Sequence, residues 1–395
     1  MTSLLHVAES LSERVVAFRR TLHRYPEIGL TLPRTRQAVL DEIADLGLAV
    51  RTSDRTSAVV AELSGALPGP TVILRGDMDA LPLTEDTALD FASEIDGTMH
   101  ACGHDTHVAM LAGAARLLAD RRDQLAGRVL FFFQPGEEGF HGAELALDEG
   151  LLDVDGDVAG AFALHITTMF ASGTINLRPG PLMAAADWFV VTLQGSGGHA
   201  SAPHLANDPV PAACEIATTI HTVLSRKIST FDPTVLTIGK ITAGTTHNII
   251  PATAELQGTI RTCSDDTRTT VQEHLHAVAD GVARAHGLTA KVELTPGYPP
   301  TVNDDAFTDL VREVASDVLG AEQVVEMVDP LMGAEDFSYV LERHAGAMAF
   351  LGACPPELEP GASPTNHSNL VVFDESALAK GVAMYAAVAS RLLVQ

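Results

Sequence analysis

The sequence is poor in cysteine, in aromatic residues and in positive charge. Its 395 residues include four cysteines, and 5% of them are aromatic. Lys and Arg number 25 against 51 Asp and Glu, a formal net charge of -26 at pH 7. Four cysteines spread over so long a chain argue against a disulfide framework and favour a cytoplasmic setting. Nucleic-acid binding needs a basic patch, so the acidic balance argues against that class of partner.

Long apolar runs are also lacking. No run approaches the roughly 20 residues that span a bilayer, so we expect no membrane partner. Residues 1–23 mix apolar with charged side chains and predict an amphipathic helix rather than a secretory signal. The composition, 46% hydrophobic and 19% charged, is typical of a soluble globular protein. The length predicts two or three domains.

The first 180 residues alternate short apolar strands with helical stretches, which is typical of an α/β sheet covered by helices. We expect strands at 58–63, 71–75 and 128–134, and helices at 107–118 and 143–149. Residues 188–295 predict the order β-α-β-β-α-β, which is the ferredoxin-like pattern. The sequence therefore predicts a domain at 182–295 inserted into a discontinuous domain made of 1–181 and 296–395.

Cys102 and His104 stand on either side of one glycine, so both side chains could reach a single ion. A thiolate and a neutral imidazole suit zinc and its neighbours among the transition metals. The alternative is an inert buried cysteine in front of a helix that Asp105 or Thr106 caps. The pair alone leaves both interpretations open.

Two adjacent carboxylates, Glu137 and Glu138, follow the apolar strand at 128–134. Strand ends in open α/β sheets are where ligands bind. Neighbouring side chains cannot easily point the same way, so one carboxylate is expected to bind metal while the other moves a proton. An exposed acidic turn is the alternative.

Two histidines lie in comparable places, His165 at the end of the apolar run 158–164 and His367 in a polar loop. Either alone is more often structural. Together the chain supplies five candidate ligands, about the number that two metal ions need beside water: Cys102, His104, Glu138, His165 and His367. Asp79 follows another buried strand and is expected to orient a ligating histidine, with a turn-forming aspartate as the alternative.

The combined motifs resemble the metallopeptidase-like amidohydrolases, which include hippurate hydrolases, N-acyl-amino-acid deacylases (aminoacylases) and auxin–amino acid conjugate hydrolases. The resemblance runs nearly end to end, through residues 23–27, 76–82, 99–107, 134–139, 197–200, 248–251, 333–337 and 366–368. It implies an α/β fold, with a two-metal aminopeptidase-like catalytic domain and an inserted ferredoxin-like α+β lid. The lid would also carry the contact of a homodimer or higher homo-oligomer.

Carried over position by position, the resemblance implies roles for individual residues. The five candidate ligands would hold two divalent ions, with zinc, manganese, cobalt and nickel all open. Glu137 would act as general base and acid in cleaving N-acyl amino acids or similar small conjugates with metal-activated water. His199 would stabilise the oxyanion when the lid closes, in its own chain or in a partner. Asn248 and Arg261 would bind the carboxylate or amide of the substrate. Asp77 is not assigned to metal.

Two other functions stay open. A dipeptidase or aminopeptidase of the same wider group would need a recognition site for a free α-amino group. A non-catalytic metal-binding or thiol-sensing protein centred on Cys102 would have no use for a base, so Glu137 argues against it.

Overall fold

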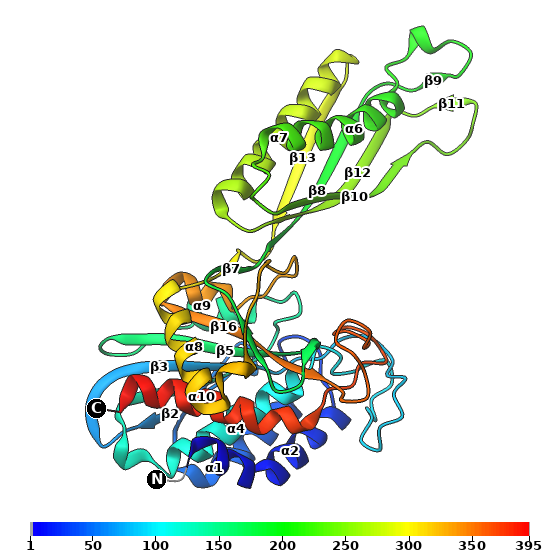
Figure 1. Ribbon diagram of the computed structural model, residues 1–395. Coiled ribbons are helices and arrows are strands. Elements are labelled where there is room, and N and C mark those ends of the chain that lie inside the picture. Colours follow the sequence, from blue (N-terminus) through cyan, green and yellow to red (C-terminus); the bar gives the residue numbers. More distant parts are fainter. Residues whose placement is uncertain (1–2, 395) are drawn as a thin grey trace. The chain divides into compact units, whose positions relative to one another are not determined.

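The computed structural model describes residues 3–394, which form two compact units (Figure 1). Unit 1 contains the chain up to Leu182, then 302–329, and the chain from Asp336 onward. Unit 2 contains 183–301 and the short segment 330–335. The inserted domain was predicted at 182–295, with 330–335 in the catalytic domain, whereas unit 2 takes in 183–301 and 330–335. No helix among the described residues is long and apolar enough to cross a membrane.

Unit 1 is built on a mixed eight-stranded sheet. Its strands, in spatial order, are β1 (Ala49–Thr52), β2 (Val59–Ser64), β4 (Ala126–Gln134), β3 (Leu67–Asp77), β5 (Val158–Ala171), β16 (Gly346–Cys354), β6 (Ile175–Leu177) and β15 (Val324–Glu326). The four central strands, β4, β3, β5 and β16, are parallel. Their carboxyl ends therefore meet at one edge of the sheet, where α/β proteins bind ligands.

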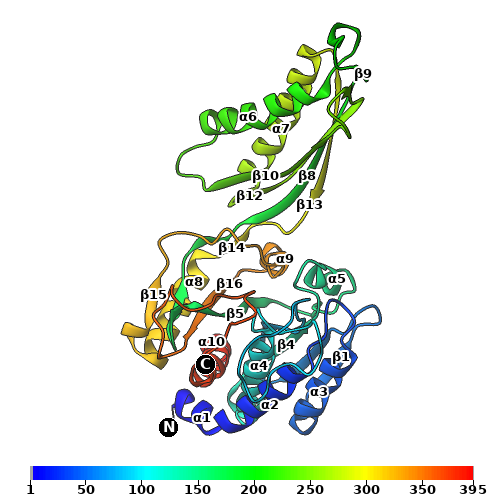
Figure 2. The ribbon, with the colours of Figure 1, turned by 90° about the vertical axis from the view of Figure 1, so that its right-hand side faces the viewer.

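Helices cover this sheet (Figure 2). They are α1 (Leu4–Ser10), α2 (Ser12–Arg24), α3 (Pro33–Ile43), α4 (His104–Ala119), α5 (Gly142–Asp148), α8 (Asp305–Leu319), α9 (Ser338–Arg343) and α10 (Leu378–Leu393). Helices α4 and α10 pack against each other and against β3, β4 and β5. Because α4 is rich in alanine and leucine on every side, it is buried almost all round.

Two predictions about unit 1 need correction. The single helix expected at 1–23 is two helices, because the N–H of Leu11 bonds the carbonyl of Ala8, three residues back, and closes α1; residues 1–2 lie outside the described chain. His165 was expected at a strand end but lies inside β5, which runs on to Ala171 beside β16. However, β3 pairs with β5 only as far as Ala163, so His165 lies on β5 beyond the last residue that pairs with β3.

Unit 2 has the predicted ferredoxin-like order. Its elements are β8 (Ala185–Gln194), β9 (Gly198–His199), α6 (Pro209–Lys227), β10 (Thr234–Ala243), β11 (Ile249–Ile250), β12 (Thr253–Thr262), α7 (Asp265–Ala285) and β13 (Thr289–Pro296). The main sheet is antiparallel in the order β10-β12-β8-β13, and α6 and α7 pack on it. A small ribbon pairs β9 with β11. Two further short strands, β7 (Gly180–Met183) and β14 (Thr301–Asn303), pair where the chain passes between the units.

Candidate active site

The five predicted ligands of unit 1 come together at the carboxyl edge of the parallel strands. Potential ligand atoms of Cys102, His104 and His165 all lie within 4.8 Å of one another. Those of Cys102, Glu138 and His367 form a second group by the same measure. Since Cys102 belongs to both groups, its thiol stands between two candidate cation positions.

The loop before α4 can place Cys102 and His104 on one centre because the residue between them is glycine. Gly103 has a φ of 90°, a left-handed conformation that glycine adopts readily. A Cβ atom there would lie 2.4 Å from the Cγ2 atom of Ile166. Any side chain at position 103 would therefore push this loop away from β5, which carries His165.

Backbone carbonyls determine which nitrogen of two histidine rings faces the centre. The Nδ1 atom of His104 lies 2.8 Å from the carbonyl oxygen of Asp79, and Nδ1 of His165 lies 2.8 Å from that of Ile166. A carbonyl only accepts, so each Nδ1 carries a proton and each neutral ring offers the lone pair of Nε2. The Nε2 atom of His165 is 3.4 Å from Sγ of Cys102.

Two buried polar atoms at this centre have no hydrogen-bond partner among the described residues: Nε2 of His104 and Oε1 of Glu138. The two atoms are 3.9 Å apart, and Nε2 of His367 lies 3.2 Å from the same glutamate oxygen. Buried polar groups are normally satisfied, so orphaned atoms that face one another suit a bound cation. The donor set of thiol, imidazole and carboxylate fits a transition metal.

Charge interactions shift the pKa values of the candidate ligands. Burial opposes protonation of His104, but Asp77 and Cys102 outweigh it and raise the His104 pKa well above its usual value. Burial lowers the pKa of His165. The neighbouring thiol of Cys102 and carboxylate of Glu138 raise the pKa of His367 to about 10. His367 also has a φ of 69°, an uncommon conformation for a residue other than glycine.

The carboxylate of Asp79 orients the glutamate pair. It accepts hydrogen bonds from the backbone N–H groups of Glu137 and Glu138, at 2.8 and 3.0 Å. The nearer Asp79 oxygen is 3.7 Å from Nδ1 of His104, whose partner is the Asp79 backbone carbonyl. Residue 79 thus holds His104 through its main chain and the loop after β4 through its side chain.

Sequence reasoning missed a buried network of Arg75, Asp77 and His107 beneath the centre. Nδ1 of His107 lies 2.5 Å from Asp77, and its Nε2 accepts the N–H of Ile166 at 2.7 Å. Both ring nitrogens are therefore engaged within the protein, and His107 is not available as a ligand. Burial would raise the pKa of Asp77, but Arg75, His104 and His107 outweigh burial and hold it well below its usual value. The only signal in the sequence was His107 three residues after His104, on the same face of a helix.

His199 and Asn248 lie together in unit 2. His199 pairs with Ile249 in the β9–β11 ribbon, and the N–H of Ala200 donates to the carbonyl of Asn248 at 3.2 Å. The N–H of Ser201 donates to Nδ1 of His199 at 3.1 Å. In the neutral ring the proton must therefore be on Nε2, which makes His199 a hydrogen-bond donor toward solvent.

Arg261 lies near the end of β12 in the main four-stranded sheet, beside Ala186 on β8. The eight residue steps from Thr253 to Arg261 span about 26 Å at ~3.3 Å per step, and β11 directly precedes the Thr253 end of β12 in the chain. The half-buried guanidinium has no hydrogen bond or ion pair with the described residues. Burial lowers its pKa, and the charge of Asp187 offsets this only in part.

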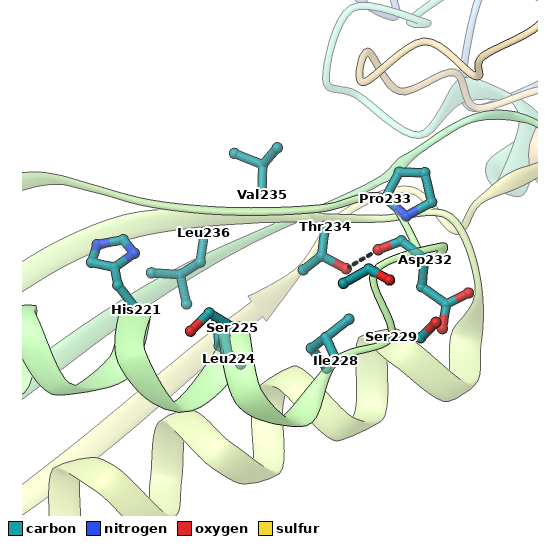
Figure 3. A pocket seen from close by; sticks show the side chains of 11 residues that line it. His221, Leu224, Ser225, Ile228, Ser229, Asp232, Pro233, Thr234, Val235 and Leu236 are labelled. Carbon is teal, nitrogen blue, oxygen red and sulfur yellow. Dashed lines mark hydrogen bonds between the residues drawn. The ribbon is translucent and has the colours of Figure 1, made fainter.

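Unit 2 also has an open groove between α6 and β10 (Figure 3). Its lining includes His221, Ser225 and Asp232, and the hydroxyl of Thr234 bonds the Asp232 carbonyl at its rim. Neither His199, Asn248 nor Arg261 lines it. The groove is therefore separate from the predicted substrate-binding residues.

Residues 73–391 match the model of the peptidase family M20/M25/M40. The chain belongs to this family. It is 37% identical to thermostable carboxypeptidase 1 of Saccharolobus solfataricus, over 96% of this chain and 95% of that protein. It is also 37% identical to N-acetyl-L-cysteine deacetylase of Bacillus subtilis, over 97% and 89%. The crystal structure of the Bacillus subtilis YXEP protein, described as a dinuclear metal-binding M20 peptidase, matches with a TM-score of 0.84 and 33% identity over 98% and 99% of the chains.

The M20 family membership confirms the predicted fold class and the prediction of an enzyme. The protein is a metal-dependent hydrolase of amide bonds, and its relative the YXEP protein is described as binding two metal ions. The relatives differ in the substrates that their names state, one a carboxypeptidase and another a deacetylase of an N-acetylated amino acid.

Proposed function

We propose that this M20 enzyme hydrolyses the amide bond of N-acyl amino acids, releasing an amino acid with a free carboxylate. The observation that carries the proposal is the pair of ligand groups that share Cys102, with Glu137 beside them. The side-chain oxygen of Glu137 lies within 4.8 Å of ligand atoms of both His104 and Glu138. A general base must lie close to the ions without belonging to either of the two ligand groups that share Cys102, and Glu137 meets both conditions.

The residues present suit two divalent ions. Cys102, His104 and His165 would hold one ion, and Cys102, Glu138 and His367 the other. Bound ions supply Lewis acidity, which acidifies water and polarises a carbonyl. Zinc, manganese, cobalt and nickel all accept this set of ligands, so availability and geometry decide which is bound.

Glu137 takes a proton from the attacking water and returns it to the departing amine, as one carboxyl group can serve as base and then acid. Its backbone N–H is bonded to Asp79, which positions the residue relative to β3. His199 donates from Nε2 to the carbonyl oxygen as negative charge develops there. This donor agrees with the tautomer that Ser201 favours.

Arg261 recognises the carboxylate of the substrate. N-acyl amino acids and the carboxyl-terminal residues of peptides both carry this carboxylate, on the carbon atom that is bonded to the nitrogen of the scissile amide. A half-buried guanidinium without a protein partner is suited to pair with a carboxylate in two parallel hydrogen bonds. Arg261→Lys should therefore reduce kcat/KM for an N-acetyl amino acid far more than for the corresponding carboxamide. An equal loss for both substrates would remove Arg261 from carboxylate recognition.

The active form is a homodimer in which His199 acts in the partner's site. Arg261 lies about 26 Å from Thr253 along β12, at ~3.3 Å per residue, and Asn248 precedes β11 at the Thr253 end of that strand, so one small substrate would not contact both within one chain. Strand β10 has one edge that no other described strand pairs with, Val235 and Ile241 on it are more than 40% exposed, and a second chain can extend such an edge.

Mixed dimers test this arrangement. Glu137→Gln and His199→Ala dimers should each be inactive, whereas co-expression of the two variants should restore activity because one site then receives both intact residues. Absence of recovery in isolated mixed dimers would show that His199 acts within its own chain or not at all.

A substrate panel tests the function itself. Metal-free enzyme is reconstituted with each of zinc, manganese, cobalt and nickel. It is then assayed on acetyl-Met, hippurate, an N-blocked dipeptide and an unblocked dipeptide. N-acyl amino acids should be cleaved best, and Glu137→Gln should abolish turnover while metal content stays near the wild-type value. Preference for the N-blocked dipeptide would indicate a carboxypeptidase, and preference for the unblocked one a dipeptidase or aminopeptidase.

A further inference from the structure

Asn366 lies at a junction of three segments that carry candidate ligands. Its side-chain amide nitrogen donates to the carbonyl of Cys102 at 2.9 Å and to that of Ile166 at 3.0 Å. Both partners are acceptors, so the group facing them must be the NH2 of the amide. The following residue is His367, whose own N–H donates to the carbonyl of Ala101 at 2.9 Å.

The carbonyl of Ile166 accepts a second hydrogen bond, from Nδ1 of His165. That bond selects the tautomer in which Nε2 of His165 faces Cys102. The backbone N–H of Ile166 donates to Nε2 of His107. The peptide groups of Ile166 therefore link α4, β5 and the loop around His367, and Asn366 is the side chain that joins this point to the Cys102 loop.

We propose that Asn366 is a positioning residue that holds the two ligand groups of the metal centre in register. The inference rests on the proposed two-metal centre. Residues 102, 166 and 366 are far apart in the chain, and the loop containing His367 has no regular secondary structure. Without the amide, the loop would keep the Ala101 contact and the hydrogen bond from Thr168 on β5 to the Pro364 carbonyl, but lose its attachment to the carbonyls of Cys102 and Ile166. The ligand residues of each group would then lose more conformational freedom when a metal binds, which weakens metal binding.

The test is a metal titration of Asn366→Ala with cobalt(II) as the probe. Cobalt reports coordination geometry through its visible bands and thiolate ligation through charge-transfer absorption, so the reading is independent of turnover. Affinity from competition with a chromophoric chelator should fall about 10- to 100-fold, as is usual when a residue supporting metal ligands is removed. With one cobalt ion bound per chain, the visible bands of the variant should also differ from those of the wild-type protein.

Asn303→Ala is the matched control. The amide nitrogen of Asn303 also donates to two backbone carbonyls in unit 1, those of Arg178 and Met348 at 3.0 and 2.9 Å. Its removal should lower the melting temperature at least as much but leave cobalt affinity unchanged. Asn366→Leu, which has a similar volume and no donor, should reproduce the loss of affinity if the alanine variant folds poorly.

Three outcomes would overturn the proposal. The first is wild-type cobalt affinity and spectrum in folded Asn366→Ala and Asn366→Leu. The second is an equal loss of affinity in Asn303→Ala, which would make the effect one of general stability. The third is a wild-type protein that binds no cobalt through Cys102; that result would overturn the two-metal centre as well, whereas the first two leave the centre intact.

Discussion

Asp79→Asn should weaken both the stability of unit 1 and the chemistry at the metal centre. The Asp79 carboxylate is 1% exposed and accepts two backbone N–H groups, from Glu137 and Glu138. Asparagine has one oxygen and one NH2, so one of these N–H groups would face another donor. Losing a hydrogen bond to a charged acceptor costs roughly 1.5–3 kcal/mol, and the stranded N–H adds to that cost. We expect a loss of about 3 kcal/mol in the free energy of unfolding.

The same change should move the base and a ligand together. Glu137 and Glu138 are both held by this carboxylate, so their loop should relax away from β3. Residues that support metal ligands typically affect metal affinity or activity 10- to 100-fold, and we expect kcat/KM to fall by about that factor. Urea denaturation gives the stability change from the shift in midpoint, and kinetics on metal-saturated enzyme gives the second value.

Glu27→Gln is the control for this prediction. The carboxylate of Glu27 likewise accepts two backbone N–H groups, those of Arg34 and Thr35 at the start of α3, at 3.3 and 2.9 Å. It should lose stability with little effect on kcat/KM. The reasoning would be refuted if Asp79→Asn kept wild-type stability. Comparable kinetics in the two variants would instead restrict Asp79 to a structural role.

Three further predictions follow from the structure. Cys102→Ala should lower the content of both metal ions, because its thiol belongs to both ligand groups, whereas His367→Ala should lower that of one; equal full occupancy by elemental analysis would contradict this assignment. His199→Ala should reduce kcat and kcat/KM together by about 10²–10³-fold at unchanged metal content, the loss typical of an oxyanion donor, and a rise in KM alone would indicate a substrate-binding role. Although burial opposes it, hydrogen bonds from His23, Thr87 and Ser93 lower the pKa of Glu85 from 4.5 to about 2. Its carboxylate should therefore stabilise the fold above pH 4.5, by up to about 3 kcal/mol, and progressively less as the pH falls toward 2. Glu85→Gln should remove that part of the pH dependence in urea titrations at pH 5 and 3, and parallel curves for the two proteins would contradict it.

Much of the fold could be predicted because hydrophobic patterning is local. The strand before Glu137 has an unbroken apolar run at 129–133, as a buried parallel strand should, and the order of elements at 188–295 indicated the ferredoxin-like unit. The break at Leu11 and the continuation of β5 past His165 could not be predicted. One depends on a single backbone hydrogen bond, and the other on pairing with β16, which is almost two hundred residues away in the chain.

By itself, the sequence determined which side chains could bind metal and move protons. The residue types have that chemistry wherever they lie, and parallel strands bring their carboxyl ends to one edge. Only the tertiary structure decided that Cys102 lies in both ligand groups, that Asp79 holds the glutamates, and that Asn366 joins Cys102 to Ile166. These arrangements depend on backbone carbonyls and N–H groups. Every residue has such groups, so their partners are chosen by packing rather than by residue type.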